Sequence, residues 1–223
     1  TMAQDKLAEL KGAGREIIFE TKTVIITTGV RPRELNIPGE KEFRSKGLSY
    51  CTVCDGPLFP GKIVAVIGGG NSALESAIMM SSIAKQVYVV NKNPEFKGDA
   101  VLIEKVKSAP NVKVIFNAIT QKILGEKMVT GVEYLDGTSN KTETLAVEGV
   151  FVHIGMVPNS GFLKEVKKNG FGEIIVNERG ETNIPGLYAA GDVTNVPYKQ
   201  ISIAVGQGTI AALSVVDYLN KIR

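Results

Sequence analysis

The sequence predicts an α/β protein with two doubly wound parallel sheets, one domain being inserted into the other. The apolar run Lys62–Ile67 is followed at once by the glycine turn Gly68–Gly70 and then by residues with helical spacing. Further apolar strands lie on both sides of this strand-turn-helix unit. Two crossings, Val30–Arg33 and Val152–Gly155, bracket the unit and indicate an insertion into a split domain.

Composition sets the broad class. The chain has 223 residues, enough for one large domain or two modest ones, and its 43% hydrophobic and 22% charged residues are ordinary for a globular protein. The net charge of +3 comes without a basic cluster, which argues against nucleic acid and against a membrane surface. We see no apolar run that approaches the length of a bilayer span and no signal-peptide core.

The N-terminal part of the sequence predicts short strands. Residues 1–15 are polar, tolerant of helix and broken by two glycines, so we assign them no role. Glu16–Glu20 reads as a short strand and Thr23–Gly29 as a buried one. The first crossing follows.

The middle of the chain predicts a parallel sheet. Lys62–Ile67 is rich in β-branched residues, as expected of a parallel strand covered on both faces. A helix is expected from Asn71 to about Ile83. Asp136-Gly137 predicts a turn. Further strands are expected at Gln86–Val90, Val112–Phe116 and Gly131–Tyr134.

The C-terminal part predicts strands and one long helix. Val150–Ile154, Glu173–Val176 and Gly186–Ala190 are apolar and strand-like. Gln200 to about Leu219 is helical and apolar nearly all round, so this helix must be buried.

Cys51 and Cys54 are the only cysteines and lie in the pattern Cys-x-x-Cys-Asp-Gly. A zinc site needs four ligands, and His153 is the only histidine, so no metal site is expected. A stapling disulfide is disfavoured because two intervening residues close almost no loop. The pair is therefore predicted to cycle between dithiol and disulfide in a reducing cytoplasm.

The segment Gly68-Gly69-Gly70-Asn71-Ser72-Ala73 fits the dinucleotide pattern G-x-G-x-x-A, directly after a strand and opening a helix. A glycine-rich turn without a ligand is the alternative. The second strand ends at Asn91, where a carboxylate would bind ribose and a pair of arginines would demand a phosphate. Neither is present, and Lys92 and Lys97 supply only mild positive charge, so NADH and NADPH both stay open.

Three further residues stand at element ends or within strands. Asp192, after Gly191, accepts hydrogen bonds from a polyol or merely caps a turn. Gln200, at the start of a helix, presents free N–H groups that suit an electron-rich ring. His153 lies within an apolar strand and reads as a core histidine.

Six short motifs follow one another along the chain: Thr27–Gly29, Ile37–Glu40, Cys51–Gly56, Gly68–Ala73, Ile154–Asn159 and Ala189–Asp192. Taken together, they resemble the low-molecular-weight thioredoxin reductases and the flavoprotein subunit of alkyl hydroperoxide reductase, which shares their core. The resemblance runs from about Phe19 to the C-terminus. Thr52-Val53 favours thioredoxin reductase and Val196–Gln200 favours the peroxide-reductase subunit.

The resemblance implies a domain plan. Residues 34–150 would be a Rossmann-like NAD(P)H-binding domain that carries the Cys-x-x-Cys, and residues 1–33 and 151–223 would be the two parts of a split FAD domain. The family's own FAD-binding glycine motif does not precede Cys51 here. We therefore expect an incomplete FAD domain, an exposed apolar face on the last helix, and a chain that is not a competent reductase by itself.

The resemblance also implies a mechanism. NAD(P)H passes a hydride to FAD, the flavin reduces the Cys51–Cys54 disulfide, and the dithiol reduces a thioredoxin-like or glutaredoxin-like protein. Cys54 would face the flavin, Cys51 would attack the partner, and Asp55 would be the acid-base group or only a turn residue. The implied state is a cytoplasmic homodimer.

The implied cofactor-binding positions are spread over the chain: Thr28, Gly29, Gly68, Gly69, Gly70, Asn71, Ser72, Ala73, Asn91, Lys92, Lys97, Ile154, Gly155, Gly191, Asp192, Lys199, Gln200 and Ile201. Two alternatives stay open, an alkyl hydroperoxide reductase core and a flavin-free NAD(P)-binding dithiol module. A visible absorption spectrum separates the last from the others, because bound FAD is yellow.

Overall fold

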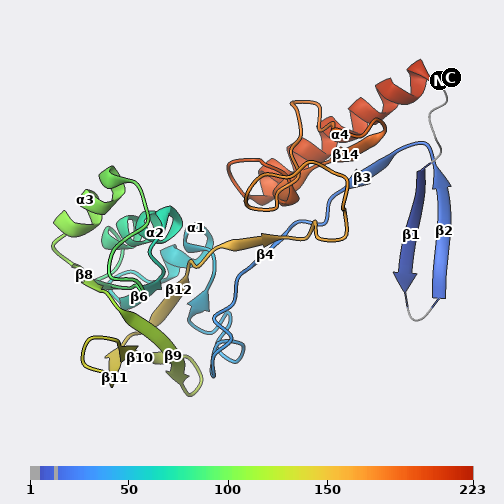
Figure 1. Ribbon diagram of the computed structural model, residues 1–223. Coiled ribbons are helices and arrows are strands. Elements are labelled where there is room, and N and C mark those ends of the chain that lie inside the picture. The colour runs from blue at the N-terminus through green and yellow to red at the C-terminus, as the bar shows by residue number, and fades with distance from the viewer. Residues whose placement is uncertain (1–5, 13–14, 223) are drawn as a thin grey trace. The chain divides into compact units, whose positions relative to one another are not determined.

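A computed structural model describes residues 6–12 and 15–222 and divides the chain into two compact units (Figure 1). One unit is Pro32–Gly155, and the other joins the chain up to Arg31 with the chain from Met156 onwards. These borders lie near the boundaries expected after residues 33 and 150. The assignment of the units to particular cofactors stays a prediction.

The unit Pro32–Gly155 is built on a five-stranded parallel sheet of order β5-β12-β6-β7-β8. β6 lies between β12 and β7 and α2 begins at Asn71, so the expected parallel strand and the helix that follows it are confirmed. Its strands are β5 (Leu48–Ser49), β6 (Ile63–Ile67), β7 (Gln86–Val90), β8 (Val112–Ile115) and β12 (Gly149–Val152).

Alternate residues of this sheet enter two different cores. Val64 and Val66 of β6 pack under the helices α2 (Asn71–Ser81) and α3 (Ala100–Ser108). Ala65 and Ile67 point to the other face. The prediction that β6 is covered on both faces is confirmed, because a parallel sheet buries both sides.

The cover of the second face is an antiparallel sheet of order β11-β10-β9. Only the middle strand β10 (Val129–Asp136) was expected, in part. β9 (Ala118–Gly125) and β11 (Lys141–Ala146) carry many polar, solvent-facing residues, which conceal the strand pattern. The buried residues that this sheet places in the shared core are Ala118, Ile123, Val129, Val132 and Tyr134.

The other unit brings together segments distant in sequence. β3 (Val24–Ile26) pairs in parallel with β14 (Leu187–Ala189), so Ile25 lies opposite Tyr188. The two connecting segments, β4 (Val30–Pro32) and β13 (Met156–Pro158), also pair with each other.

Two segments differ from what the sequence indicated. The N-terminus, to which we assigned no role, forms β1 (Lys6–Gly12), which pairs antiparallel with β2 (Arg15–Thr21), where a strand was expected at Glu16–Glu20. Glu173–Val176 is not a strand, because only Ile174 makes isolated bridges, to Lys168 and to Thr194. Pairing with a neighbour, which local sequence does not show, decided both cases.

The long helix α4 (Ile201–Lys221) differs from expectation in its burial. Of its residues only Ala211 and Ser214 are buried, whereas Ile201, Val205 and Leu213 are 85%, 65% and 63% exposed. The expectation that it is buried was wrong, and the expected exposed apolar face is present. The helix is also long and apolar enough to cross a bilayer, contrary to expectation, although core helices meet the same criterion.

Candidate functional site

The redox pair sits at the start of the short helix α1 (Thr52–Asp55). Cys51 and Cys54 form a disulfide with their Cα atoms 5.3 Å apart. Cys51 is the N-cap, and its Sγ accepts a hydrogen bond of 3.2 Å from the Cys54 N–H. Cys51 is half-buried and Cys54 is exposed. A thiolate on Cys51 would be stabilised by the same N–H group at the helix start.

Asp55 is held beside the disulfide by Ser49. The Ser49 hydroxyl lies 2.5 Å from Asp55 Oδ2, and Ser49 Oγ accepts a hydrogen bond of 3.0 Å from the Cys51 N–H. The Asp55 carboxyl group is thus linked through Ser49 to the backbone of Cys51, and Asp55 follows Cys54 directly in the chain, a position suited to a proton donor or acceptor for the cysteines. Sequence reasoning missed Ser49, whose only signal was its position two residues before Cys51.

A second hydrogen-bonded group lies on the other side of α1. Thr52 is 4% exposed, and its Oγ1 lies 2.6 Å from Ser76 Oγ and 2.7 Å from His153 Nε2. Burial lowers the pKa of His153 to about 4, so the imidazole is neutral at neutral pH. His153, expected in the core, is half-buried and contacts the helix that carries the redox pair.

The glycine turn after β6 runs close to the neighbouring strand end and leaves the start of α2 uncapped. Gly68 has φ +143°, and a side chain there would collide with the carbonyl of His153. Gly70 is the N-cap of α2 without a side-chain cap, and no described atom lies within 4 Å of where its Cβ would be. The start of α2 thus has no side-chain cap and has open space beside Gly70, and an uncapped glycine turn of this kind fits a dinucleotide phosphate.

The loop after β7 folds over this turn. Asn91 is 1% exposed; its Nδ2 donates to Glu95 O at 2.8 Å, and its Oδ1 accepts from Asn93 N at 3.2 Å. The Lys97 N–H donates to Gly69 O at 2.8 Å. The Asn91 amide is therefore engaged within its own loop.

Asn71, in the first turn of α2, also holds this loop. Its Nδ2 lies 3.0 Å from Asp99 Oδ2 and its Oδ1 accepts from Asp99 N at 2.8 Å. Ser72 is exposed at the same end of α2, whereas Ala73 is buried below Gly68. Lys92 and Lys97 are exposed.

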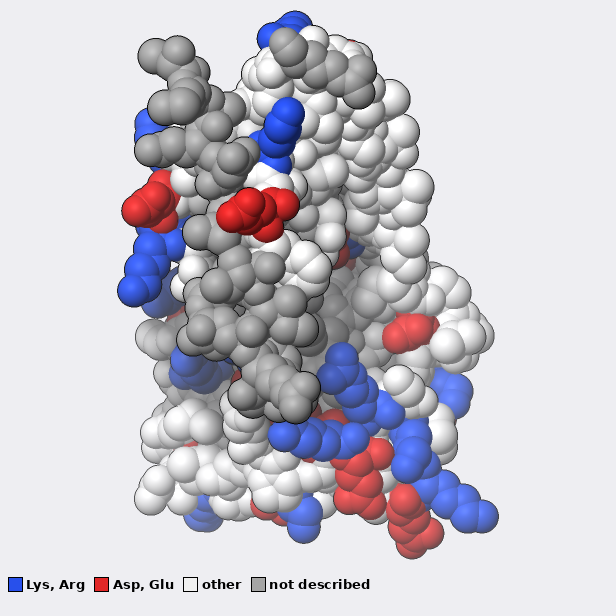
Figure 2. Space-filling model, turned by 90° about the vertical axis from the view of Figure 1, so that its right-hand side faces the viewer, with Lys and Arg blue, Asp and Glu red and all other residues white. Residues whose placement is uncertain are grey.

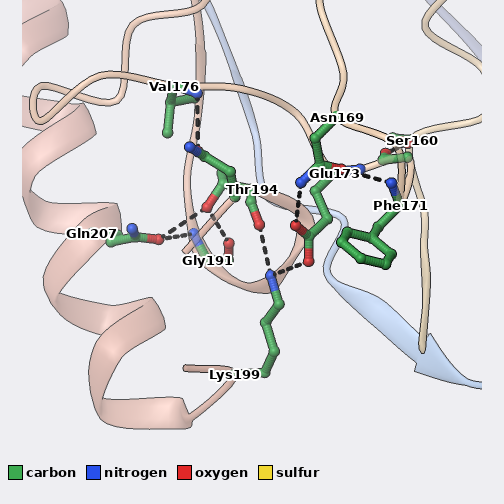
Figure 3. Close-up of polar contacts among 11 residues, drawn as sticks. Ser160, Asn169, Phe171, Glu173, Val176, Gly191, Thr194, Lys199 and Gln207 are labelled. Carbon is green, nitrogen blue, oxygen red and sulfur yellow. Dashed lines mark hydrogen bonds and ion pairs between the residues drawn. The ribbon is translucent and has the colours of Figure 1, made fainter. Parts of the chain in front are cut away.

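The unit that contains α4 has its own candidate site. Gly191 and Asp192 lie in the short helix η2 (Gly191–Val193) directly after β14, and Gln207 Oε1 accepts from the Gly191 N–H at 2.8 Å (Figure 3). Asp192 Oδ1 is buried and has no hydrogen-bond partner among the described residues. A buried carboxylate oxygen without a donor fits a hydroxyl-bearing ligand such as the ribityl chain of a flavin.

Lys199, one of the expected cofactor-binding residues, is engaged within the protein (Figure 3). Its ammonium lies 2.8 Å from Glu173 Oε1 and 2.6 Å from Thr194 O. Asn169 Nδ2 holds the other oxygen of Glu173 at 2.7 Å. Lys199 therefore anchors the segment that leads to Gln200, the N-cap of α4.

Thr28 and Gly29 lie after β3 and are bound to the segment around Asn159. Thr28 Oγ1 donates to Asn159 O at 2.7 Å, and the Asn159 N–H donates to Gly29 O at 2.9 Å. At the second crossing, Gly155 O accepts from Arg33 N at 2.9 Å, next to Ile154.

The structure thus places the expected residues in two groups. The unit Pro32–Gly155 holds the disulfide, Asp55, the glycine turn and Asn91, with Ile154 and Gly155 at its end. The other unit holds Thr28, Gly29, Gly191, Asp192, Lys199, Gln200 and Ile201. On the face shown in Figure 2, acidic and basic side chains are interspersed, in keeping with the mild net charge.

Comparisons with known proteins agree with this chemistry. A family model described as pyridine nucleotide-disulphide oxidoreductase matches residues 2–208. An alkyl hydroperoxide reductase subunit of Pseudomonas putida is 50% identical over 219 residues, which cover 97% of this chain and 42% of that protein. An NADH dehydrogenase of Bacillus subtilis is 49% identical, with 91% of this chain and 40% of the relative covered. The chain thus spans about two fifths of the length of these curated relatives.

Solved structures share the fold. Thioredoxin reductase from Streptococcus pyogenes superposes with a TM-score of 0.87 at 33% identity, over 97% of this chain and 74% of that one. Thioredoxin reductase from T. acidophilum has a TM-score of 0.68 at 40% identity, over 98% of this chain and 74% of that one. The predicted α/β fold class and the stated resemblance are confirmed.

Proposed function

The chain belongs to the pyridine nucleotide-disulphide oxidoreductase family, and on that premise we propose that it carries electrons from NAD(P)H by way of FAD to the Cys51–Cys54 disulfide, and then to a thioredoxin-like or glutaredoxin-like protein. The observation that carries the proposal is the disulfide on α1 in the same compact unit as an open, glycine-lined helix start.

NAD(P)H would supply a hydride and FAD would convert it into electrons for the disulfide. The chain's own part begins at Gly68–Gly70, where the free N–H groups of α2 would bind the pyrophosphate. Lys92 and Lys97 are the exposed cations of the loop after β7, and we propose that they meet the adenosine end of either NADPH or NADH. Asn91 and Asn71 would shape this loop from within.

The flavin would bind in the other unit. Asp192 Oδ1 would accept a hydrogen bond from the ribityl chain, and the start of α4 at Gln200 and Ile201 would present N–H groups to the ring. Thr28, Gly29, Ile154, Gly155 and Gly191 would complete the set expected for cofactors. Lys199 would act through Glu173 and Thr194, by holding the segment before Gln200.

The disulfide chemistry balances within the chain and its partner. Reduction breaks the Cys51–Cys54 bond and adds two electrons and two protons, which gives two thiols. Cys51 then attacks a sulfur of the partner's disulfide and forms a mixed disulfide, and Cys54 displaces the partner as a dithiol. Asp55, fixed by Ser49, would transfer protons to and from these sulfurs.

A second candidate function follows from the matches in sequence. Relatives whose sequences are about 50% identical to this chain include alkyl hydroperoxide reductase subunits and NADH dehydrogenases. In this alternative the same dithiol would serve a peroxide-reducing partner and NADH would be the preferred donor. A cytoplasmic homodimer is proposed for either candidate.

The test is cofactor oxidation by the purified protein with added FAD, comparing NADH with NADPH and an oxidised thioredoxin with a peroxidase plus hydroperoxide. Oxidation that requires one of these acceptors and is lost in Cys54→Ser supports the proposal. Oxidation of the same rate in Cys54→Ser would sink it.

A further inference from the structure

The hydrogen bonds that Thr52 of α1 makes with Ser76 and His153 support a further inference. We propose that His153 is a positioning residue, which holds α1 through Thr52 and thereby sets the reduction potential of the Cys51–Cys54 pair. The inference rests on the proposed function only in taking this pair as redox-active. It concerns how readily the disulfide is reduced, whichever partner or cofactor takes part.

Helix α1 needs such support because of its length. It has four residues, Thr52–Asp55, and an isolated helix so short is unstable in water. Thr52 Oγ1 contacts Ser76 on α2 at 2.6 Å and His153 Nε2 at 2.7 Å. Thr52 and Ser76 are each 4% exposed, so water competes little for these hydrogen bonds.

His153 is itself held firmly. It follows β12 directly, and its N–H donates to Ile67 O, the last residue of β6, at 2.8 Å. Its carbonyl packs against Gly68 of the glycine turn. The Thr52 hydroxyl therefore connects α1 both to α2 and to His153, which lies at the end of β12 beside the glycine turn.

The hydrogen bonds can all be satisfied at once. In one arrangement the Ser76 hydroxyl donates to Thr52 Oγ1 and the Thr52 hydroxyl donates to His153 Nε2; in the other an Nε2–H donates to Thr52 Oγ1 and the Thr52 hydroxyl donates to Ser76 Oγ. The first arrangement needs a neutral imidazole with its proton on Nδ1, and burial of His153 favours the neutral form. Removing the Thr52 hydroxyl takes this partner from both Ser76 and His153, and removing the imidazole takes one of its two partners from Thr52.

The tether acts differently on the two redox forms. In the disulfide form the covalent bond already holds Cys51 near Cys54, so loss of the tether frees little motion. In the dithiol form only the surrounding contacts keep the cysteines close, so loss of the tether frees more. Without the tether the dithiol is therefore favoured, and the disulfide becomes easier to reduce.

The test measures the disulfide fraction in dithiothreitol redox buffers by thiol alkylation and mass spectrometry, with neither nicotinamide nor flavin present. Thr52→Val removes the hydroxyl and keeps the shape, and His153→Leu removes the imidazole. His153→Gln keeps an acceptor near the position of Nε2. Thr120→Val is the matched control, since Thr120 Oγ1 is buried and no described atom is its partner.

We expect Thr52→Val and His153→Leu to lower the equilibrium constant for disulfide formation about threefold to tenfold, where tenfold equals about 30 mV for two electrons. His153→Gln should restore part of the wild-type value, and Thr120→Val should match it. If Thr52→Val does not fold, Ser76→Ala tests the same network from outside α1.

Two outcomes overturn the inference. One is an equal constant in Thr52→Val and Thr120→Val. The other is an equal loss of thermal stability in the oxidised and reduced forms, since a purely structural role moves both together and leaves the potential unchanged. A pair that no buffer reduces would contradict the proposed function as well. A pair that cycles with one constant in all variants contradicts only the role of His153.

Discussion

Helix α2 buries five of its 11 residues, whereas α4 buries two of its 21. α2 lies over β6 and β7, whose valines receive its apolar side chains. α4 packs onto Tyr188 and Ala190 near β14 and leaves the rest of its apolar surface exposed. An apolar sequence therefore promotes burial only where a second layer lies opposite.

The largest expected effect tests this contrast directly. Leu74 of α2 is 0% exposed and Leu213 of α4 is 63% exposed. Leu74→Ala should lower the free energy of unfolding by about 2–5 kcal/mol, because it leaves a cavity. Leu213→Ala should change it by less than about 0.5 kcal/mol.

Urea unfolding at several protein concentrations measures both variants. A large, concentration-dependent loss in Leu213→Ala would break the comparison, because it would mean that the face of α4 is covered by another chain in solution.

The stability of the unit that carries α2 should depend on pH through His153. The pKa of His153 falls from 6.5 to about 4 on folding, so the unfolded chain binds more protons between these values. The stability that neutral His153 contributes is complete above about pH 6.5 and is lost as the pH falls toward 4, by up to about 3 kcal/mol.

The difference between wild type and His153→Gln in urea unfolding from pH 7 to 4 isolates this group from the carboxylates. Parallel curves for the two proteins would contradict the prediction.

The unit that carries α4 is not weakly held throughout. In the ion pair between Lys199 and Glu173 the two side chains are only 16% and 18% exposed. In the ion pair between Arg179 and Asp217 of α4 they are 50% and 58% exposed. Glu173→Gln should cost about 2 kcal/mol, since it weakens a charged hydrogen bond shielded from water. Asp217→Asn should leave the unfolding curve unchanged, because exposed pairs contribute little.

Thermal unfolding of the two variants at low and high salt provides the comparison. Equal losses in both would show that shielding does not matter here.

Two glycines with open surroundings, one at the start of α2 and one inside α4, should show small stability effects. No described atom lies within 4 Å of a Cβ built at Gly70 or at Gly206. Gly70→Ala should change stability by less than about 1 kcal/mol, yet weaken NAD(P)H binding about tenfold, because the backbone can no longer approach the pyrophosphate. Gly206→Ala, inside α4, should raise stability by about 0.5–1 kcal/mol and leave binding unchanged.

Fluorescence titration with NADH and NADPH reads the binding of both variants. Unchanged affinity in Gly70→Ala would mean that the open helix start is not the nucleotide site.

The local pattern of the sequence was sufficient to predict the strand β6, the glycine turn and the start of α2. Each depends on neighbours in the chain: β-branched residues for a doubly covered strand, glycines for a tight turn, and helical spacing after Asn71. The redox-active pair could also be predicted from the sequence, because both cysteines lie in one short segment.

Only the tertiary structure decided which layers cover the sheet and which side chains support the disulfide. The antiparallel cover of β9–β11 is made of strands with polar outer faces, so its pairing left little trace in hydrophobicity. Thr52 meets Ser76 and His153 across 24 and 101 positions. Hydrogen bonds between such distant residues follow from how whole elements pack, and no local periodicity encodes them.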